Sequence, residues 1–243
     1  MIFLCCDTAT PAESVAVVRD GVVLAERVAV RGKVHGPTLI DTLHETLAEA
    51  GLTPGQVDVV VCGLGPGSFT GLRIALATLK GMALALDRPL YGVRTVEAFR
   101  HAHPGERVVA VVDARRGEVF ADAADSEVLE APLSVKPELL AERLAGQGRL
   151  LLLGSGAELY ADRLRAALPD AELPADPQAH LPRAGLLARS VDVATPPPNL
   201  AALEPLYVRA SDAELNYPDG FPDALMTPKQ KLPPKRRPGA TAG

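Results

Sequence analysis

One stretch, residues 57–86, constrains the fold most, because it joins a strand, a glycine-rich loop and a long apolar helix. Residues 57–62 are continuous and rich in valine, which is typical of a strand buried on both faces. Four glycines mark the loop: Gly63, Gly65, Gly67 and Gly71. Ser68 or Thr70 can cap the helix that follows. The rest of the chain must be arranged around this unit.

A glycine loop before a helix can bind phosphate, because the amides at a helix N-terminus attract anions. The spacing here does not match the phosphate motifs. The P-loop pattern requires Lys and then Ser or Thr after its last glycine, but Leu72 and Arg73 follow Gly71. The dinucleotide pattern fails as well, since Thr70 stands where its third glycine is required. We interpret the loop as a tight structural turn, with direct anion binding as the alternative.

The helix of residues 72–86 is apolar or small on nearly every side. Its charges, Arg73 and Lys80, are seven residues apart and lie on nearly the same face. A helix on a single core needs an apolar stripe of only about 100°, so this helix should be covered on two sides. A subunit interface would provide the second cover, and burial within its own domain is the alternative.

Small residues repeat at every fourth position of this helix, and such a repeat lets another backbone come close. The residues we predict for a partner interface are Leu72, Ile74, Ala77, Thr78, Gly81, Met82 and Ala85. The helix of residues 36–50 should lie beside them. Periodicity alone leaves open which of these residues face a partner and which face the chain's own core.

The string GLGPGSFTGLRIALATLKGMALAL resembles the signature of the bacterial TsaB (YeaZ) family. Shorter matching strings are CCDTATPAESVAVVRDG, VVDARRGEVFAD and EPLYVR, so the resemblance spans residues 2–209. It implies the fold shared by actin, Hsp70 and sugar kinases (the ASKHA fold). It also implies a part in making threonylcarbamoyl-adenosine in tRNA.

The resemblance further implies partners. Proteins of this family pair with a larger catalytic transferase, TsaD, which installs threonylcarbamoyl on the adenosine next to the anticodon. A TsaE-type ATPase belongs to the same complex, and the helix surface supports a homodimer when TsaD is absent. ATP and magnesium are then used by the complex and tRNA is contacted indirectly, so we expect no cofactor on this chain.

Composition limits the remaining functions. A net charge of −5 gives no reason to expect nucleic acid as a direct ligand. Cys5, Cys6 and Cys62 lie in apolar runs and are expected to be buried thiols, so we predict no disulfide and no metal site. The start of the chain lacks a basic signal region, and the apolar run 74–86 is short and contains Lys80. We therefore expect a cytoplasmic protein without a membrane segment.

The order of predicted elements recurs along the chain. An apolar strand that ends in Asp7, a returning strand, a helix, and then a strand, glycine loop and helix are repeated from a strand that ends in Asp113. This pattern predicts a duplicated ββαβα fold of the α/β class with a reduced second copy. The expected division is residues 1–104, residues 105–210 with a last short strand at 206–208, and a disordered Pro- and Lys-rich tail at 211–243.

Nucleotide phosphates in the ASKHA fold lie between two hairpins, and an acid at the end of the first strand organises the metal ion. Asp7, Thr8 and Asp113 are the candidates for a vestigial cleft of this kind. The first hairpin turn, residues 7–13, contains no glycine and includes Pro11, which lacks an amide donor. We therefore predict a noncatalytic scaffold subunit. An ATP-dependent small-molecule kinase or ATPase of the same superfold is the alternative.

Overall fold

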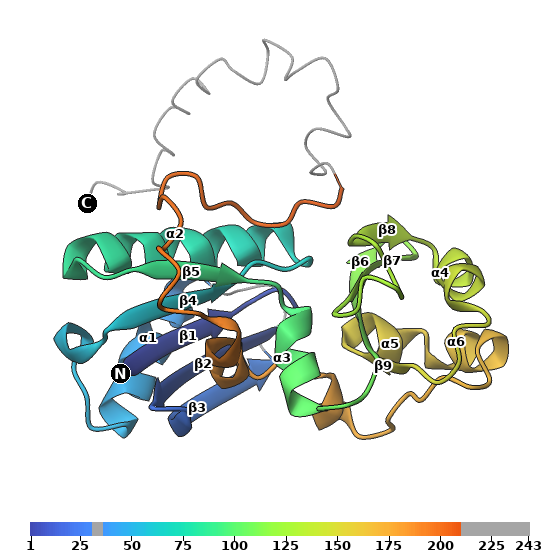
Figure 1. Cartoon of the computed structure of the whole chain (residues 1–243), viewed down its shortest axis with the longest axis horizontal. Coiled ribbons are helices and arrows are strands. Elements are labelled where there is room, and N and C mark those ends of the chain that lie inside the picture. The colour runs from blue at the N-terminus through green and yellow to red at the C-terminus, as the bar shows by residue number, and fades with distance from the viewer. Residues whose placement is uncertain (31–35, 210–243) are drawn as a thin grey trace, which may run out of the picture. The chain divides into compact units, whose positions relative to one another are not determined.

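The structure is a computed structural model that describes residues 1–30 and 36–209, except for the side chains of residues 36–38. Residues 1–209 form one compact unit (Figure 1). The stretch 211–243, for which we expected disorder, lies outside the described residues.

The first half of the unit is a five-stranded sheet in the order β3-β2-β1-β4-β5. Its elements are β1 (Ile2–Asp7), β2 (Ala12–Arg19), β3 (Val22–Val30), α1 (Gly36–Glu49), η1 (Pro54–Gln56), β4 (Val59–Gly63), α2 (Phe69–Leu86), β5 (Leu90–Val93) and α3 (Val96–Ala102). β1 is central, antiparallel to β2 and parallel to β4. The strand, loop and helix predicted for residues 57–86 are therefore β4, the loop after it, and α2.

Both faces of this sheet are covered, which explains why its central strands are continuous apolar runs. Side chains alternate along a strand, so Leu4 and Cys6 of β1 pack against α1 and α2. Cys5 points to the opposite face, where α3 and a later 3-10 helix cover it. The three cysteines are buried and free, as their apolar surroundings predicted.

The second half is a four-stranded sheet in the order β8-β7-β6-β9. Its elements are β6 (Val108–Arg115), β7 (Glu118–Ala123), β8 (Leu133–Val135), α4 (Pro137–Leu144), β9 (Leu151–Leu153), α5 (Ser155–Leu159), α6 (Ala161–Ala167), η2 (Pro177–His180) and η3 (Ala184–Ser190). β6 takes the place of β1, antiparallel to β7 and parallel to β9.

The two halves repeat one arrangement, and the second is reduced. β6, β7, β8, α4 and β9 follow each other as β1, β2, β3, α1 and β4 do. Where β5 pairs with β4, the second half has only an isolated parallel bridge between Leu151 and Glu172. The predicted duplicated α/β fold of the ASKHA type is confirmed. The three-residue strand β8 was missed, because it is too short to show an alternating pattern.

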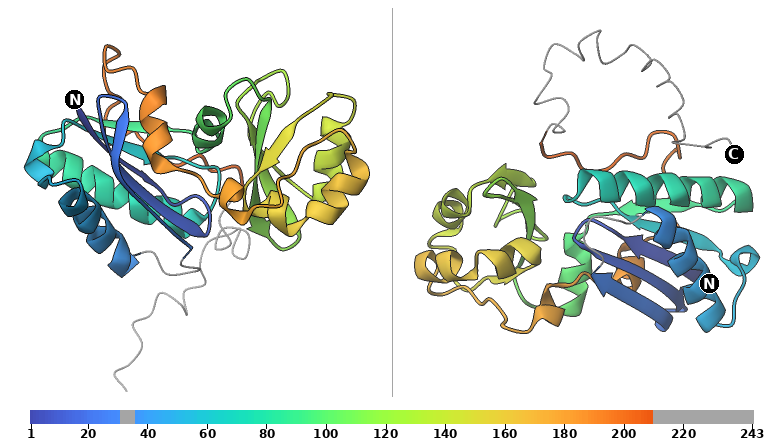
Figure 2. Two further views of the ribbon diagram at one scale, coloured as in Figure 1. Left: turned by 90° about the horizontal axis from the view of Figure 1, so that it is seen from below. Right: turned by 180° about the vertical axis from the view of Figure 1, so that it is seen from behind.

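After α6 the chain returns to the first sheet (Figure 2). In η3 the Ala184 amide donates a 2.8 Å hydrogen bond to Ser14 Oγ of β2. Leu203 is then buried in the core beneath α2. The short strand expected at 206–208 was wrong: the chain is irregular there, and Leu206 donates a backbone hydrogen bond to Leu64. The boundary at residue 104 stays our proposal. η3, Leu203 and Leu206 pack on the first half, whereas Arg209 contacts β6 and β7 of the second half.

Candidate functional site

The glycine loop packs directly on the turn between β1 and β2. A β-carbon on Gly63 would overlap the carboxylate of Asp7. A β-carbon on Gly67 would overlap the Ala9 carbonyl group, and one on Gly71 would overlap the Thr8 carbonyl oxygen. These three glycines are required because another part of the backbone fills the space that side chains would occupy.

The chain's own carbonyl and hydroxyl groups satisfy amides at the start of α2. The Ser68 amide donates to the Ala9 carbonyl at 2.8 Å. Ser68 is the N-cap, and its hydroxyl accepts from the Gly71 amide at 3.2 Å. A phosphate here would have to displace both acceptors. The geometry therefore favours a structural turn over a phosphate cradle.

Asp7 lies at the end of β1 and is fully buried. Its Oδ1 accepts from the Ala9 amide at 2.9 Å, and its Oδ2 accepts from the Thr95 hydroxyl at 2.7 Å. Burial raises the pKa of Asp7 above its ordinary value, and the two hydrogen bonds oppose that rise. Thr8 is also buried, and its hydroxyl has no hydrogen-bond partner among the described residues. Asp7 serves here as an internal anchor of the turn.

Asp113 has the equivalent place at the β6–β7 turn. Its Oδ1 accepts from the Arg115 amide at 2.9 Å, two residues further on, as Asp7 does with Ala9. The Asp113 amide donates to Ser155 Oγ at 3.2 Å. Both acids therefore cap a turn. Within residues 1–30 and 36–209, no hydrogen bond or ion pair joins Asp7 to Asp113.

Helix α2 has one face in the core and one face toward solvent. Its core residues are Gly71, Leu72, Ala75, Leu76, Leu79 and Ala83. Leu72, which we predicted for a partner interface, is 1% exposed and packs in the chain's own core. Ala77, Gly81 and Ala85 are exposed, while Ile74, Thr78 and Met82 are half-buried at the flanks.

We use the name α2 outer face for the exposed, uncharged residues of this helix: Thr70, Ala77, Gly81, Leu84 and Ala85. Leu84 is 75% exposed, the largest fraction among the large hydrophobic side chains of the described residues. Gly81 has open space where a β-carbon would point. A second backbone can therefore approach α2 closely along this face.

A returning segment of the same chain, which includes Ala201 and Tyr207, also covers part of α2. The sequence did not predict this contact. Arg73 Nε donates to the Tyr207 hydroxyl at 2.7 Å, and Lys80 Nζ donates to the Ala201 carbonyl at 3.5 Å. The two charges predicted to share a face of α2 thus both hold the returning segment. Their common face was the signal that could have indicated a contact from elsewhere in the chain.

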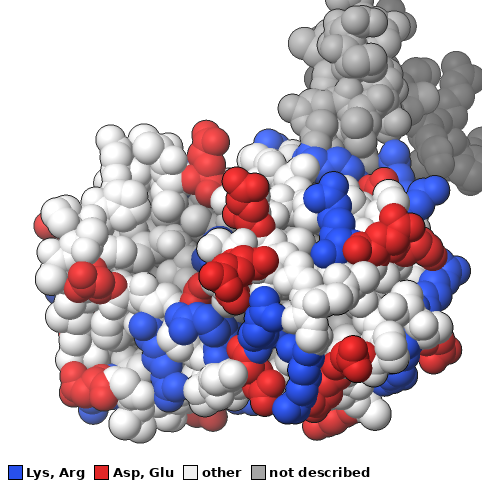
Figure 3. All heavy atoms as spheres, turned by 45° about the vertical axis from the view of Figure 1, so that its right-hand side comes forward, with Lys and Arg blue, Asp and Glu red and all other residues white. Residues whose placement is uncertain are grey.

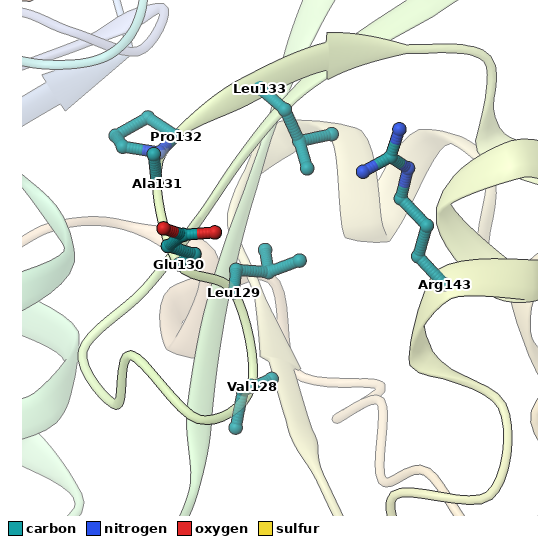
Figure 4. Close-up of a pocket in the computed structure, with 7 residues that line it drawn as sticks. All are labelled: Val128, Leu129, Glu130, Ala131, Pro132, Leu133 and Arg143. Carbon is teal, nitrogen blue, oxygen red and sulfur yellow. The ribbon is translucent and has the colours of Figure 1, made fainter.

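Away from α2, the structure has a cavity of about 390 Å³ in the second half. Residues 128–133 and Arg143 of α4 line it (Figure 4). None of the residues predicted for a site lies there. Figure 3 shows Lys and Arg interspersed with Asp and Glu on the face that it draws. That face offers no reason to expect a nucleic-acid ligand.

Residues 1–30 and 36–209 contain no group of three or more His, Cys, Asp or Glu side chains that could hold a metal ion. By length and apolar composition, α2 is the one described helix that could cross a membrane, and 33% of it is buried within the structure.

The sequence comparisons agree with the fold. A family model described as "TsaD: tRNA N6-adenosine threonylcarbamoyltransferase" matches residues 23–169. An uncharacterized protein of Mycobacterium tuberculosis is 38% identical over 213 residues, which are 87% of this chain and 93% of that protein. The Escherichia coli protein TsaB, a tRNA threonylcarbamoyladenosine biosynthesis protein, is 32% identical over 173 residues, 67% of this chain and 74% of its own.

A solved structure agrees as well. YeaZ from Pseudomonas aeruginosa superposes with a TM-score of 0.68 at 29% identity, over 85% of this chain and 99% of that one. The match thus extends through both sheets and is not limited to the loop and helix. On these sequence and structural grounds, the chain belongs to the TsaB (YeaZ) family of tRNA threonylcarbamoyladenosine biosynthesis proteins.

Proposed function

We propose that this chain is a noncatalytic subunit that pairs with a TsaD-type transferase for threonylcarbamoyl transfer to the adenosine next to the anticodon of tRNA. The observation that carries the proposal is the α2 outer face, an exposed row of small and apolar residues on the longest helix of the structure. A match to the transferase family model over residues 23–169 supports a partner of related fold.

The α2 outer face suits a helix of a partner protein. Ala77, Gly81 and Ala85 let a second helix approach within a short interaxial distance, and Leu84 provides a large apolar side chain for it to bury. Exposed apolar surface of this kind is typical of protein interfaces. We propose the interface from Ile74, Ala77, Thr78, Gly81, Met82 and Ala85, with Leu84 added and Leu72 assigned to the core.

The environment of Asp7 supports a noncatalytic role for this chain. Both of its carboxylate oxygens already accept hydrogen bonds from Ala9 and Thr95. The glycine loop, in turn, is filled by residues 7–9. A metal ion or phosphate at this place would have to displace contacts within the chain, so we assign ATP and magnesium to other subunits of the complex.

The wider assembly is part of the same proposal. A TsaE-type ATPase joins the complex, tRNA is contacted indirectly, and two copies of this chain pair through the α2 outer face when the transferase is absent. Such a complex works on tRNA, so we place the protein in the cytoplasm.

The test is threonylcarbamoyl-adenosine formation on tRNA by the same organism's transferase and its other partners, with and without this chain. The proposal requires that product formation depends on the chain and that the chain alone hydrolyses no ATP. Full activity without it would refute the proposal. Tight binding of magnesium-ATP by the isolated chain would favour the kinase alternative instead.

Paired variants locate the interface. Leu84→Arg places a charge on the α2 outer face, and Leu139→Arg makes the same change on α4, where the leucine is 47% exposed. Gly81→Arg provides a second test of the α2 outer face. We expect the Leu84 and Gly81 variants to stay folded and to lose binding to the transferase, because a long cation at a close helix contact must be desolvated or must push the helices apart. Leu139→Arg should bind as the unmodified chain does.

A further inference from the structure

The segment of residues 199–209 runs along α2 and then reaches the second sheet (Figure 1). We call it the strap. It begins after the proline-rich stretch 196–198 and has no regular secondary structure. The strap contacts both halves of the unit, so we describe its contacts with each half in turn.

Near its C-terminal end, the strap is fastened to the start of α2 through Tyr207. The rings of Tyr207 and Phe69 lie 5.1 Å apart. The Arg73 guanidinium lies over both rings, 3.9 Å from the centre of Phe69 and 5.4 Å from that of Tyr207, and it also donates to the Tyr207 hydroxyl. Stacking of this kind adds to a hydrogen bond between the same two side chains. This group of three forms the first anchor.

Before the first anchor in the chain, the strap is held by burial and by a backbone hydrogen bond. Leu203 enters the core beneath α2. The Leu206 amide donates to the Leu64 carbonyl at 2.9 Å, in the loop before α2. The strap therefore contacts the glycine loop as well as the helix.

Two residues after Tyr207, Arg209 fastens the strap to the second sheet. Arg209 donates to Glu118 Oε2 at 2.7 Å and to the Ala114 carbonyl at 2.9 Å. Its guanidinium also lies 5.5 Å from the centre of the Phe120 ring. All three partners belong to the β6–β7 hairpin, whose first strand contains Asp113. This is the second anchor.

The first anchor adjoins the α2 outer face. Tyr207 is 43% exposed, and Arg73 is exposed between Thr70 and Ala77, three and four residues away on the helix. A protein that docks on that face can therefore contact Tyr207 and Arg73 too. Such contacts would favour the state in which the strap is closed.

We propose that the strap couples the partner surface on α2 to the β6–β7 hairpin, so that docking of a TsaD-type partner holds the strap closed and restrains the hairpin. The coupling to a partner rests on the proposed function; the coupling between the two anchors does not. Coupling between two sites is reciprocal. If binding of the partner stabilises the second anchor, then loosening that anchor must weaken binding of the partner by the same factor.

The first experiment uses the isolated full chain. Hydrogen exchange is compared for unmodified protein, Tyr207→Ala and the control Leu139→Ala, a surface change on α4. We expect faster exchange in the β6–β7 hairpin for the Tyr207 variant alone, although that residue does not hydrogen bond to the hairpin in the structure. In the reverse direction, Arg209→Met should speed exchange of the Leu206 amide. Unchanged exchange in both variants, with the fold intact, would overturn the coupling.

The second experiment measures binding of the transferase to unmodified chain, Arg209→Met and Leu139→Ala. We expect the Arg209 variant to bind about fivefold more weakly, and the control to bind normally. Normal binding by Arg209→Met would overturn the link to the partner, even if the exchange result holds. If the unmodified chain itself does not bind the transferase, the proposed function fails, and the exchange experiment still decides whether the anchors are coupled.

Discussion

The Thr95 hydroxyl donates a 2.7 Å hydrogen bond to Asp7, although 88 residues separate the two in the chain. The same hydroxyl oxygen accepts from the Gly65 amide at 3.2 Å. One buried side chain thus joins the end of β1, the glycine loop and the start of α3. The turn between β1 and β2 is therefore fastened from inside the protein.

Replacing Thr95 by valine keeps the branched shape and removes this hydroxyl. Buried groups of Asp7 and Gly65 then lose a partner, so the free energy of unfolding near pH 7 should fall by about 1–3 kcal/mol. The Thr95 bond holds the pKa of Asp7 down against burial, so its loss should raise that pKa further. The loss of unfolding free energy caused by Thr95→Val should therefore become smaller as the pH falls, because Asp7 becomes neutral in both the folded and the unfolded state.

Urea unfolding at several pH values measures this effect. Thr95→Ser is the matched control, since it restores the hydroxyl and removes only a methyl group. Equal deficits in the two variants at every pH would contradict the role assigned to the hydrogen bond.

A methyl group on Gly63 should destabilise the fold, because it would overlap the Asp7 carboxylate. We expect Gly63→Ala to cost about 1–3 kcal/mol of unfolding free energy, as overpacking in a filled core does. Gly55→Ala, where the new methyl meets open space, is the control and should change stability little. Thermal or urea unfolding of both variants checks the difference. A Gly63 variant as stable as the Gly55 variant would exclude the proposed packing role.

Asp122 on β7 should make stability depend on pH. Its side chain is buried and ion-paired with Arg94 at 2.9 Å, and its Oδ2 has no hydrogen-bond partner among the described residues. Burial raises the pKa of Asp122 to about 6, even though Arg94 opposes the rise. Between the ordinary value of 3.8 and about 6 the folded state holds a proton that the unfolded state has lost.

The Asp122 contribution to stability is therefore fully present below pH 4 and is lost as the pH rises through about 6. Asp122→Asn removes this titration. Relative to the unmodified protein, the variant should gain up to about 3 kcal/mol between pH 4 and pH 7. Denaturation curves at pH 4, 5, 6 and 7 measure the change, and parallel pH profiles for the two proteins would contradict it.

The side chain of His180 in η2 forms hydrogen bonds with the loop after β9 and with the segment just before η2. Its Nδ1 accepts from the Gly154 amide at 3.1 Å, and its Nε2 lies 2.9 Å from the Pro174 carbonyl, which accepts from it. Only the neutral ring with its proton on Nε2 makes both bonds.

His180→Ala leaves the Gly154 amide without its acceptor in a buried place. We expect a loss of about 2–4 kcal/mol, from the unpaired groups and the space left behind. His180→Gln, which offers an acceptor and a donor, should recover part of the loss. The free energy of unfolding in urea distinguishes the variants, and no gain from glutamine would count against the hydrogen bonds as the cause.

The elements with strong patterns could be predicted from sequence. The valine-rich run of β4 indicated a buried strand, and the recurrence of Asp7 and Asp113 indicated a duplicated fold. Helix α2 was harder. Because its residues are apolar or small nearly all round, periodicity could not separate Leu72, which faces the core, from Ala77, which faces solvent.

The strap could not be predicted from local pattern. Arg73 and Tyr207 are 134 residues apart. The shared face of Arg73 and Lys80 could indicate a contact on α2, but it could not identify the segment that makes it. The packing of the glycine loop on residues 7–9 was also hidden. Sequence spacing excluded the known phosphate motifs, but the space that the glycines provide became clear only from the position of the β1–β2 turn.

The return of η3 to the first sheet also bears on how the protein is made. Ala184 bonds to Ser14, 170 residues earlier, and Leu187 covers Cys5 and Val61 on the outer side of that sheet. A nascent chain that has emerged only as far as α6 therefore has this side covered by α3 but not by η3. The first sheet, although synthesised first, completes its core last, and until then its apolar side is a surface for chaperones to shield.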